Sequence, residues 1–60
     1  MNATVTLTRK TKASAEREAA IYAAMSPELN FRVIARDGIY YVVRDWHPSD
    51  EGRNFQTITA

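Results

Sequence analysis

The dipeptide Asp37-Gly38 constrains the fold most, because it lies between two runs rich in apolar, β-branched and aromatic residues. An Asp-Gly pair in this setting is a strong hairpin signal, since both residues tolerate the positive φ angles that tight turns need. The stretch 30–46 is therefore predicted to form two antiparallel strands. Arginines stand among the apolar residues of these strands, so the register of the hairpin decides what the arginines face.

Two registers are possible, and a shift of one residue exchanges the two faces of a strand. A two-residue turn at Asp37-Gly38 would give one mixed face, made of Phe31, Val33, Ala35, Tyr40, Val42 and Arg44. A three-residue loop at 36–38 would give one entirely apolar face, made of Phe31, Val33, Ala35, Ile39, Tyr41 and Val43. We expect the three-residue loop because it makes one face wholly apolar. The opposite face would then mix charged, aromatic and aliphatic side chains: Arg32, Ile34, Tyr40, Val42, Arg44 and Trp46.

Residues 4–8 alternate strictly between threonine and aliphatic residues, which predicts a half-exposed strand with Val5 and Leu7 on one face. An alanine-rich helix is predicted for residues 14–25, with Ser14 as its cap and two glutamates, Glu16 and Glu18, in its first turn. Pro27 ends this helix. At about 100° per residue, one broad side of the helix would face the sheet. That side comprises Ala15, Ala19, Ile21, Tyr22 and Met25.

These elements predict an α+β fold of order β-α-β-β, in which one helix packs on a three-stranded antiparallel sheet. The first strand should pair antiparallel with the third, and residues 55–59 could add a short fourth strand. Residues 1–60 are expected to form one compact domain, because 45% hydrophobic and 25% charged residues are an ordinary globular balance.

Charge and targeting features narrow the function classes. The formal net charge of +1 gives no global field that would attract nucleic acid or anionic lipid. The apolar run 19–25 is too short to span a bilayer, and the N-terminus has its basic residues after its apolar ones, unlike a secretory signal. We therefore expect a cytoplasmic protein without a membrane segment.

The mixed face of the hairpin is the predicted binding surface. Arginine, tyrosine and tryptophan are enriched where binding energy concentrates at protein interfaces. In the alternative interpretation, arginine stems only cover the apolar residues between them. The predicted partner-binding residues, including rim charges in the loop that follows, are Arg32, Arg36, Tyr40, Arg44, Trp46, Asp50 and Glu51.

Nucleic-acid binding is the second hypothesis, since aromatic and basic residues on an exposed sheet can stack bases and contact phosphates. Its residues would be Arg9, Lys10, Lys12, Arg32 and Arg44. Open strand edges give a further possibility, a homodimer formed by edge-strand pairing.

Metal, catalytic and cofactor sites are not predicted. The segment 45–51 holds Asp45, His47, Asp50 and Glu51, but a credible metal site needs a second histidine or a cysteine, and the chain has one His and no Cys. His47 could serve a serine as base only at Ser14, Ser26 or Ser49, and none of these lies in a nucleophile motif. The two glycines stand apart, so there is no glycine-rich phosphate loop.

In its small size, lack of cysteine and order of strand, alanine-rich helix and "RVIARDGIYYVVRD" hairpin, the chain resembles the small phage-encoded inhibitors of bacterial defence, above all the anti-CRISPR proteins. The resemblance implies a non-enzymatic inhibitor that docks on a defence complex and sterically blocks DNA binding or nuclease recruitment. Some such inhibitors imitate DNA with an acidic surface. This slightly basic chain departs from them, so the resemblance implies blocking of a protein groove.

Overall fold

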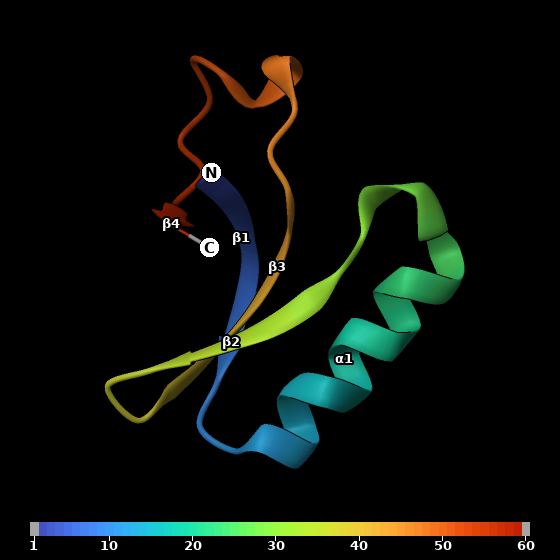
Figure 1. Cartoon of the computed structure of the whole chain (residues 1–60), viewed down its shortest axis with the longest axis vertical. Coiled ribbons are helices and arrows are strands. Elements are labelled where there is room, and N and C mark those ends of the chain that lie inside the picture. Colours follow the sequence, from blue (N-terminus) through green and yellow to red (C-terminus); the bar gives the residue numbers. More distant parts are fainter. Residues whose placement is uncertain (1, 60) are drawn as a thin grey trace.

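The fold is a four-stranded antiparallel sheet with one helix packed against it, as seen in a computed structural model that describes residues 2–59 (Figure 1). In chain order the elements are β1 (Asn2–Arg9), α1 (Lys12–Met25), the 3₁₀ helix η1 (Pro27–Leu29), β2 (Arg32–Arg36), β3 (Ile39–Asp45), the 3₁₀ helix η2 (Pro48–Asp50) and β4 (Thr57–Thr59). The predicted α+β class and β-α-β-β order are confirmed, and the optional last strand is present. Of the predicted domain 1–60, residues 1 and 60 lie outside the described residues.

The sheet order is β2-β3-β1-β4, so the first strand pairs antiparallel with the third, as predicted. In Figure 1, α1 lies to the right of β1 and β3, whereas β4 and the tip of the β2–β3 hairpin lie to their left. None of the helices within residues 2–59 is long and apolar enough to cross a membrane.

The hairpin register differs from the prediction. Arg36 pairs with Ile39, which leaves only Asp37 and Gly38 in the turn. Both have positive φ, 51° and 77°, as a type I′ turn requires. The prediction of a three-residue loop was wrong because it assumed that only one face of the hairpin buries apolar residues.

Both faces of the sheet bury apolar side chains. The helix-side core consists of Ala15, Ala19 and Val42, with partly buried Leu7, Tyr22, Phe31, Val33 and Tyr40 around them. The far-side core consists of Ala3, Val5 and Val43, with partly buried Ile34, Tyr41 and Ile58 around them. The sheet therefore has no bare apolar face, and the predicted mixed face is divided between its two sides.

Because of a register shift, β1 contributes apolar side chains to both cores. Val5 pairs with Val43 and Leu7 pairs with Val42, with the irregularity between them at Thr6. Because neighbouring residues of β3 point to opposite faces, Val5 lies in the far-side core and Leu7 in the helix-side core. The predicted common face for these two residues is therefore wrong.

The helix begins earlier than predicted and buries a narrower side. Its cap is Thr11, whose side chain accepts a hydrogen bond from the backbone N–H of Ser14, so Ser14 is not the cap. With this start, no acidic residue lies in the first turn. The helix ends at Met25, with Ser26 as its C-cap, in agreement with the effect expected of Pro27.

Two of the five helix residues predicted to face the sheet are exposed. Ala15 and Ala19 are buried, and the ring of Tyr22 stacks on that of Phe31 at a centroid distance of 5.3 Å. Ile21 and Met25 are 50% and 69% exposed. At about 100° per residue they lie roughly 120° and 80° around the helix from Ala15.

Candidate binding loop

The residues between β3 and β4, numbers 46–56, form the candidate functional site and are called the 46–56 loop below. The 3₁₀ helix η2 begins with a reciprocal cap: the backbone N–H of Ser49 donates to Nδ1 of His47 at 3.1 Å, and the backbone N–H of His47 donates to Oδ2 of Asp50 at 3.1 Å. The backbone N–H groups of Asp50, Glu51 and Arg53 donate to carbonyls within the loop. The first part of the loop is thus held by its own hydrogen bonds.

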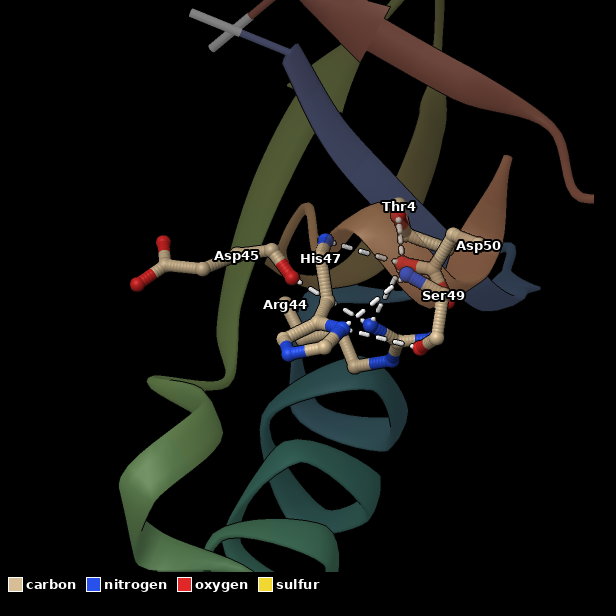
Figure 2. A network of polar contacts seen from close by, with 6 residues as sticks. All are labelled: Thr4, Arg44, Asp45, His47, Ser49 and Asp50. Carbon is tan, nitrogen blue, oxygen red and sulfur yellow. Dashed lines mark hydrogen bonds and ion pairs between the residues drawn. The ribbon is translucent and has the colours of Figure 1, made fainter.

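A buried ion pair attaches this loop to the sheet. Two guanidinium nitrogens of Arg44, in β3, donate to the two carboxylate oxygens of Asp50, each at 2.8 Å. The hydroxyl of Thr4, in β1, donates to Oδ2 of Asp50 at 3.0 Å. Figure 2 shows Thr4 of β1, Arg44 of β3 and the backbone of His47 converging on the Asp50 carboxylate. Within residues 2–59, no buried side-chain nitrogen or oxygen lacks a hydrogen-bond partner.

The electrostatics follow from this geometry. The hydrogen bonds from Arg44 hold the pKa of Asp50 far below its ordinary value, and those from the His47 backbone and from Thr4 act in the same direction, against the opposing effect of burial. The Asp50 hydrogen bond in turn raises the pKa of Arg44. Both groups therefore remain ionised at neutral pH.

Two aromatic side chains are exposed on the loop. Trp46 is 41% exposed and Phe55 is 44% exposed. The Arg44 guanidinium carbon lies 5.7 Å from the centre of the Phe55 ring, which is within the range of a cation–π contact. Arg44 thus contacts both Asp50, in the first half of the loop, and Phe55, near its end. The result is two exposed aromatic side chains on a loop whose first part is held by its own hydrogen bonds.

The predicted partner-binding residues do not share one surface in the structure. Trp46 and Glu51 are exposed on the 46–56 loop. Asp50 is buried and is not the rim charge that we predicted, because Arg44 and Thr4 enclose its carboxylate. Tyr40 packs in the helix-side core.

The two remaining arginines of the predicted surface, Arg32 and Arg36, lie on β2 and are on the same face of the sheet as the far-side core. Arg32 forms an ion pair with Asp45 at 2.9 Å and also donates to the carbonyl of Asn30. Arg36 donates to the carbonyl of Thr59 in β4. This contact joins β2 and β4, the two edge strands of the sheet.

The residues of the nucleic-acid hypothesis do not form one basic surface. Arg9 pairs with Glu18 and Lys12 pairs with Glu16, each at 3.8 Å. Arg32 and Arg44 pair with Asp45 and Asp50 and stand on opposite faces of the sheet, since Arg32 is aligned with Val43, the neighbour of Arg44. Lys10 is exposed in the turn after β1.

The groups that this site offers to a ligand are exposed aromatic and charged side chains. Among residues 2–59, no group of three or more His, Asp or Glu side chains is placed to hold a metal ion. No pocket is present in the part of the chain that the structure describes. The Nδ1 atom of His47 contacts Ser49 Oγ at 2.8 Å, but the same nitrogen accepts the Ser49 backbone N–H as part of the cap.

Phe55 and Thr4 are the site residues that sequence reasoning did not assign. An isolated aromatic residue in a polar loop, as in the segment "EGRNFQT", was the available signal for Phe55. Thr4 carried no such signal, because it meets Asp50 only through the fold, 46 positions away in the chain.

Compared with protein-family models, curated proteins and solved structures, the chain matches none.

Proposed function

We propose that the protein is a non-enzymatic protein-binding module and that the 46–56 loop is its contact surface. The observation that carries the proposal is the exposure of Trp46 and Phe55 on a loop anchored by the buried Arg44–Asp50 pair. Tryptophan is among the residues that contribute most to protein interfaces. A loop that is already ordered loses less conformational entropy when it binds, so its contacts are converted into affinity more fully.

The residues of the 46–56 loop and of its anchor have different roles in this proposal, and Phe55 and Arg53 join the residues predicted from the sequence. Trp46 and Phe55 serve as anchors, and Glu51 and Arg53 are exposed charges at the rim. Arg44 and Asp50 keep the loop in shape and do not touch the partner. This division explains why a chain with so few residues can present aromatic side chains without burying them in its own core.

The proposed partner is a bacterial defence complex, in keeping with the resemblance to anti-CRISPR proteins. The module would act in the cytoplasm of a bacterial host, as a steric block to DNA binding or nuclease recruitment. Because the proposed contact is a protruding loop with aromatic anchors, the complementary site on the partner would be a groove of a protein rather than a phosphate backbone.

The test is capture from a bacterial lysate that has been treated with nuclease, with wild type, Trp46→Ala, Phe55→Ala and Ile21→Ala immobilised in parallel. Ile21 is the matched control, since it is an exposed apolar residue on α1, away from the loop. We expect the wild type and Ile21→Ala to retain the same stoichiometric complex at moderate salt, and both loop variants to lose it.

Two outcomes would overturn this proposal. Retention of the complex by both loop variants would remove the 46–56 loop as the contact surface. In a parallel capture without nuclease, recovery of nucleic acid alone, lost steeply as the salt concentration rises, would support the nucleic-acid hypothesis instead, because such binding depends on the release of counterions.

A further inference from the structure

The outer edge of β2 differs from the other edge of the sheet. In the order β2-β3-β1-β4, the strands β2 and β4 are the two edges. β4 has only three residues, and the carbonyl of Thr59 is occupied by the Arg36 side chain. β2 has five residues in continuous register with β3, without a proline or a bulge. Short length, bulges and blocked backbone groups are how proteins protect sheet edges, so β4 is protected and β2 is open.

The register of the hairpin identifies the backbone groups on this edge. In a two-residue hairpin the residues that flank the turn, Arg36 and Ile39, exchange hydrogen bonds with each other, and the pattern then alternates along the strands. Ile34 and Arg32 therefore direct their N–H and C=O groups toward β3. Val33 and Ala35 direct theirs outward. In Figure 1, β2 crosses in front of β1 and β3, and no other element lies over it.

The arginines of β2 oppose pairing with a second copy of the chain. An antiparallel copy that used the whole strand would be centred on Ile34 and would place Arg32 of each copy opposite Arg36 of the other. Like charges directly opposite each other destabilise a strand pair. An acidic residue at each of these two positions would have the opposite effect. Arg36 can meet such a residue, since its contact within residues 2–59 is with the neutral carbonyl of Thr59. Arg32 already forms an ion pair with Asp45 at 2.9 Å, so it would share its charge between Asp45 and the added acidic residue.

We propose that the outer edge of β2 binds an extended acidic segment of a partner protein as an additional antiparallel strand. The segment would have an acidic residue, three β-forming apolar residues and a second acidic residue, aligned with residues 32–36. Main-chain hydrogen bonds to Val33 and Ala35 would supply affinity, and Arg36, with a smaller contribution from the Asp45-paired Arg32, would select for acidic side chains. This surface is distinct from the 46–56 loop, so it does not depend on the function proposed above.

The test uses synthetic peptides and the amide spectrum of the ¹⁵N-labelled protein. The probe is the capped peptide Thr-Glu-Val-Ile-Val-Glu-Thr, and its control has lysine in place of both glutamates. We expect the acidic peptide to cause saturable shifts at the amides of Val33 and Ala35. We also expect the lysine peptide to bind at least tenfold more weakly and Trp46→Ala to bind the acidic peptide like wild type. Three results would overturn the proposal: equal binding of the two peptides, amide shifts confined to the 46–56 loop, or a concentration-dependent dimer that forms without peptide.

Ala35→Pro is the decisive variant. Proline removes only the outward N–H of residue 35, and proline is tolerated on edge strands where the N–H faces solvent. Ala35→Thr is its control, because threonine keeps the N–H and suits a strand. We expect at least a tenfold loss of affinity for the acidic peptide with Ala35→Pro and none with Ala35→Thr, whereas equal affinities would overturn the proposal.

Modified peptides give the same test without altering the protein. Methylation of both valine amides, which would face β2, should abolish binding, and methylation of the central isoleucine amide, which would face away, should not. Equal effects of the two modifications would contradict the assigned edge and register.

Discussion

Arg44 and Asp50 are six positions apart in the chain and form a bidentate ion pair, with both N–O distances at 2.8 Å. The pair joins the end of β3 to the 46–56 loop, and Thr4 of β1 donates to the same carboxylate. A buried ion pair is a weak source of net stability, because removing two charges from water offsets much of their attraction. The contribution of this pair is therefore geometric, and it can be tested through pH and through conservative substitution.

The first prediction concerns acid. Arg44 lowers the pKa of Asp50 in the folded protein, so the unfolded chain binds a proton at higher pH than the folded chain does. The stabilising effect of Asp50 is therefore complete above about pH 5, which is about one unit above its unfolded pKa of about 3.9, and is lost progressively as the pH falls from there toward the folded pKa. Thermal melts between about pH 2 and pH 6 should show a steeper fall in Tm for wild type than for Asp50→Asn. Parallel curves would contradict the lowered pKa.

The second prediction concerns the shape of the cation. Arg44→Lys keeps the charge but cannot donate to both carboxylate oxygens in a planar fork or stack on Phe55 in the same way. Amide hydrogen exchange should become faster at residues 46–53 while the strands remain protected. Arg32→Lys is the control, since the Arg32–Asp45 pair is more exposed and should contribute about 0–1 kcal/mol. Similar exchange in the two variants would remove the special role of Arg44.

The third prediction concerns the close approach of α1 to the sheet. Ala15 is fully buried in the helix-side core with Val42, so Ala15→Leu should lower the free energy of unfolding by about 1–3 kcal/mol through overpacking. Ala20 is exposed on the same helix, and Ala20→Leu should change the free energy of unfolding by no more than about 0.5 kcal/mol. Urea denaturation measures both, and equal effects would contradict the position of the helix.

The fourth prediction concerns the hairpin turn. Gly38 has a φ of 77° and no atom within 4 Å of an added Cβ, so the cost of Gly38→Ala comes from the backbone alone. We expect Gly38→Ala to destabilise the protein by about 1 kcal/mol, measured by urea denaturation. Asp37→Asn should be neutral or slightly stabilising, because Asn-Gly is favoured in type I′ turns. A neutral Gly38→Ala would indicate that the turn has another conformation.

Much of the fold could be predicted from local patterns. The Asp37-Gly38 turn, the alanine-rich segment before Pro27 and the alternating residues 4–8 each indicate one element, and short connections restrict how the elements combine. The register was mispredicted because a purely apolar hairpin face was taken as the only surface that needs burial. In the structure, Val42 and Val43 are neighbours and both fully buried, on opposite faces of one sheet.

The candidate site was less predictable, because its geometry depends on contacts between distant residues. Trp46 could be identified from its residue type and its place after the last strand of the hairpin. The role of Asp50 could not, because whether a loop carboxylate is a rim charge or a buried anchor depends on Thr4 and Arg44, which come from two different strands. The register shift at Thr6 likewise could not be predicted, because residues 4–8 alternate strictly as in a regular strand.

The central claim is that Trp46 on the 46–56 loop is the anchor of a protein interface. The most direct test is a calorimetric titration of the captured and purified complex with wild type, Trp46→Ala and Ile21→Ala at neutral pH. We predict that Trp46→Ala weakens binding at least about tenfold, which corresponds to about 1.4 kcal/mol, and that Ile21→Ala binds like wild type. Binding by Trp46→Ala at wild-type affinity, or an equal loss with Ile21→Ala, would contradict the account.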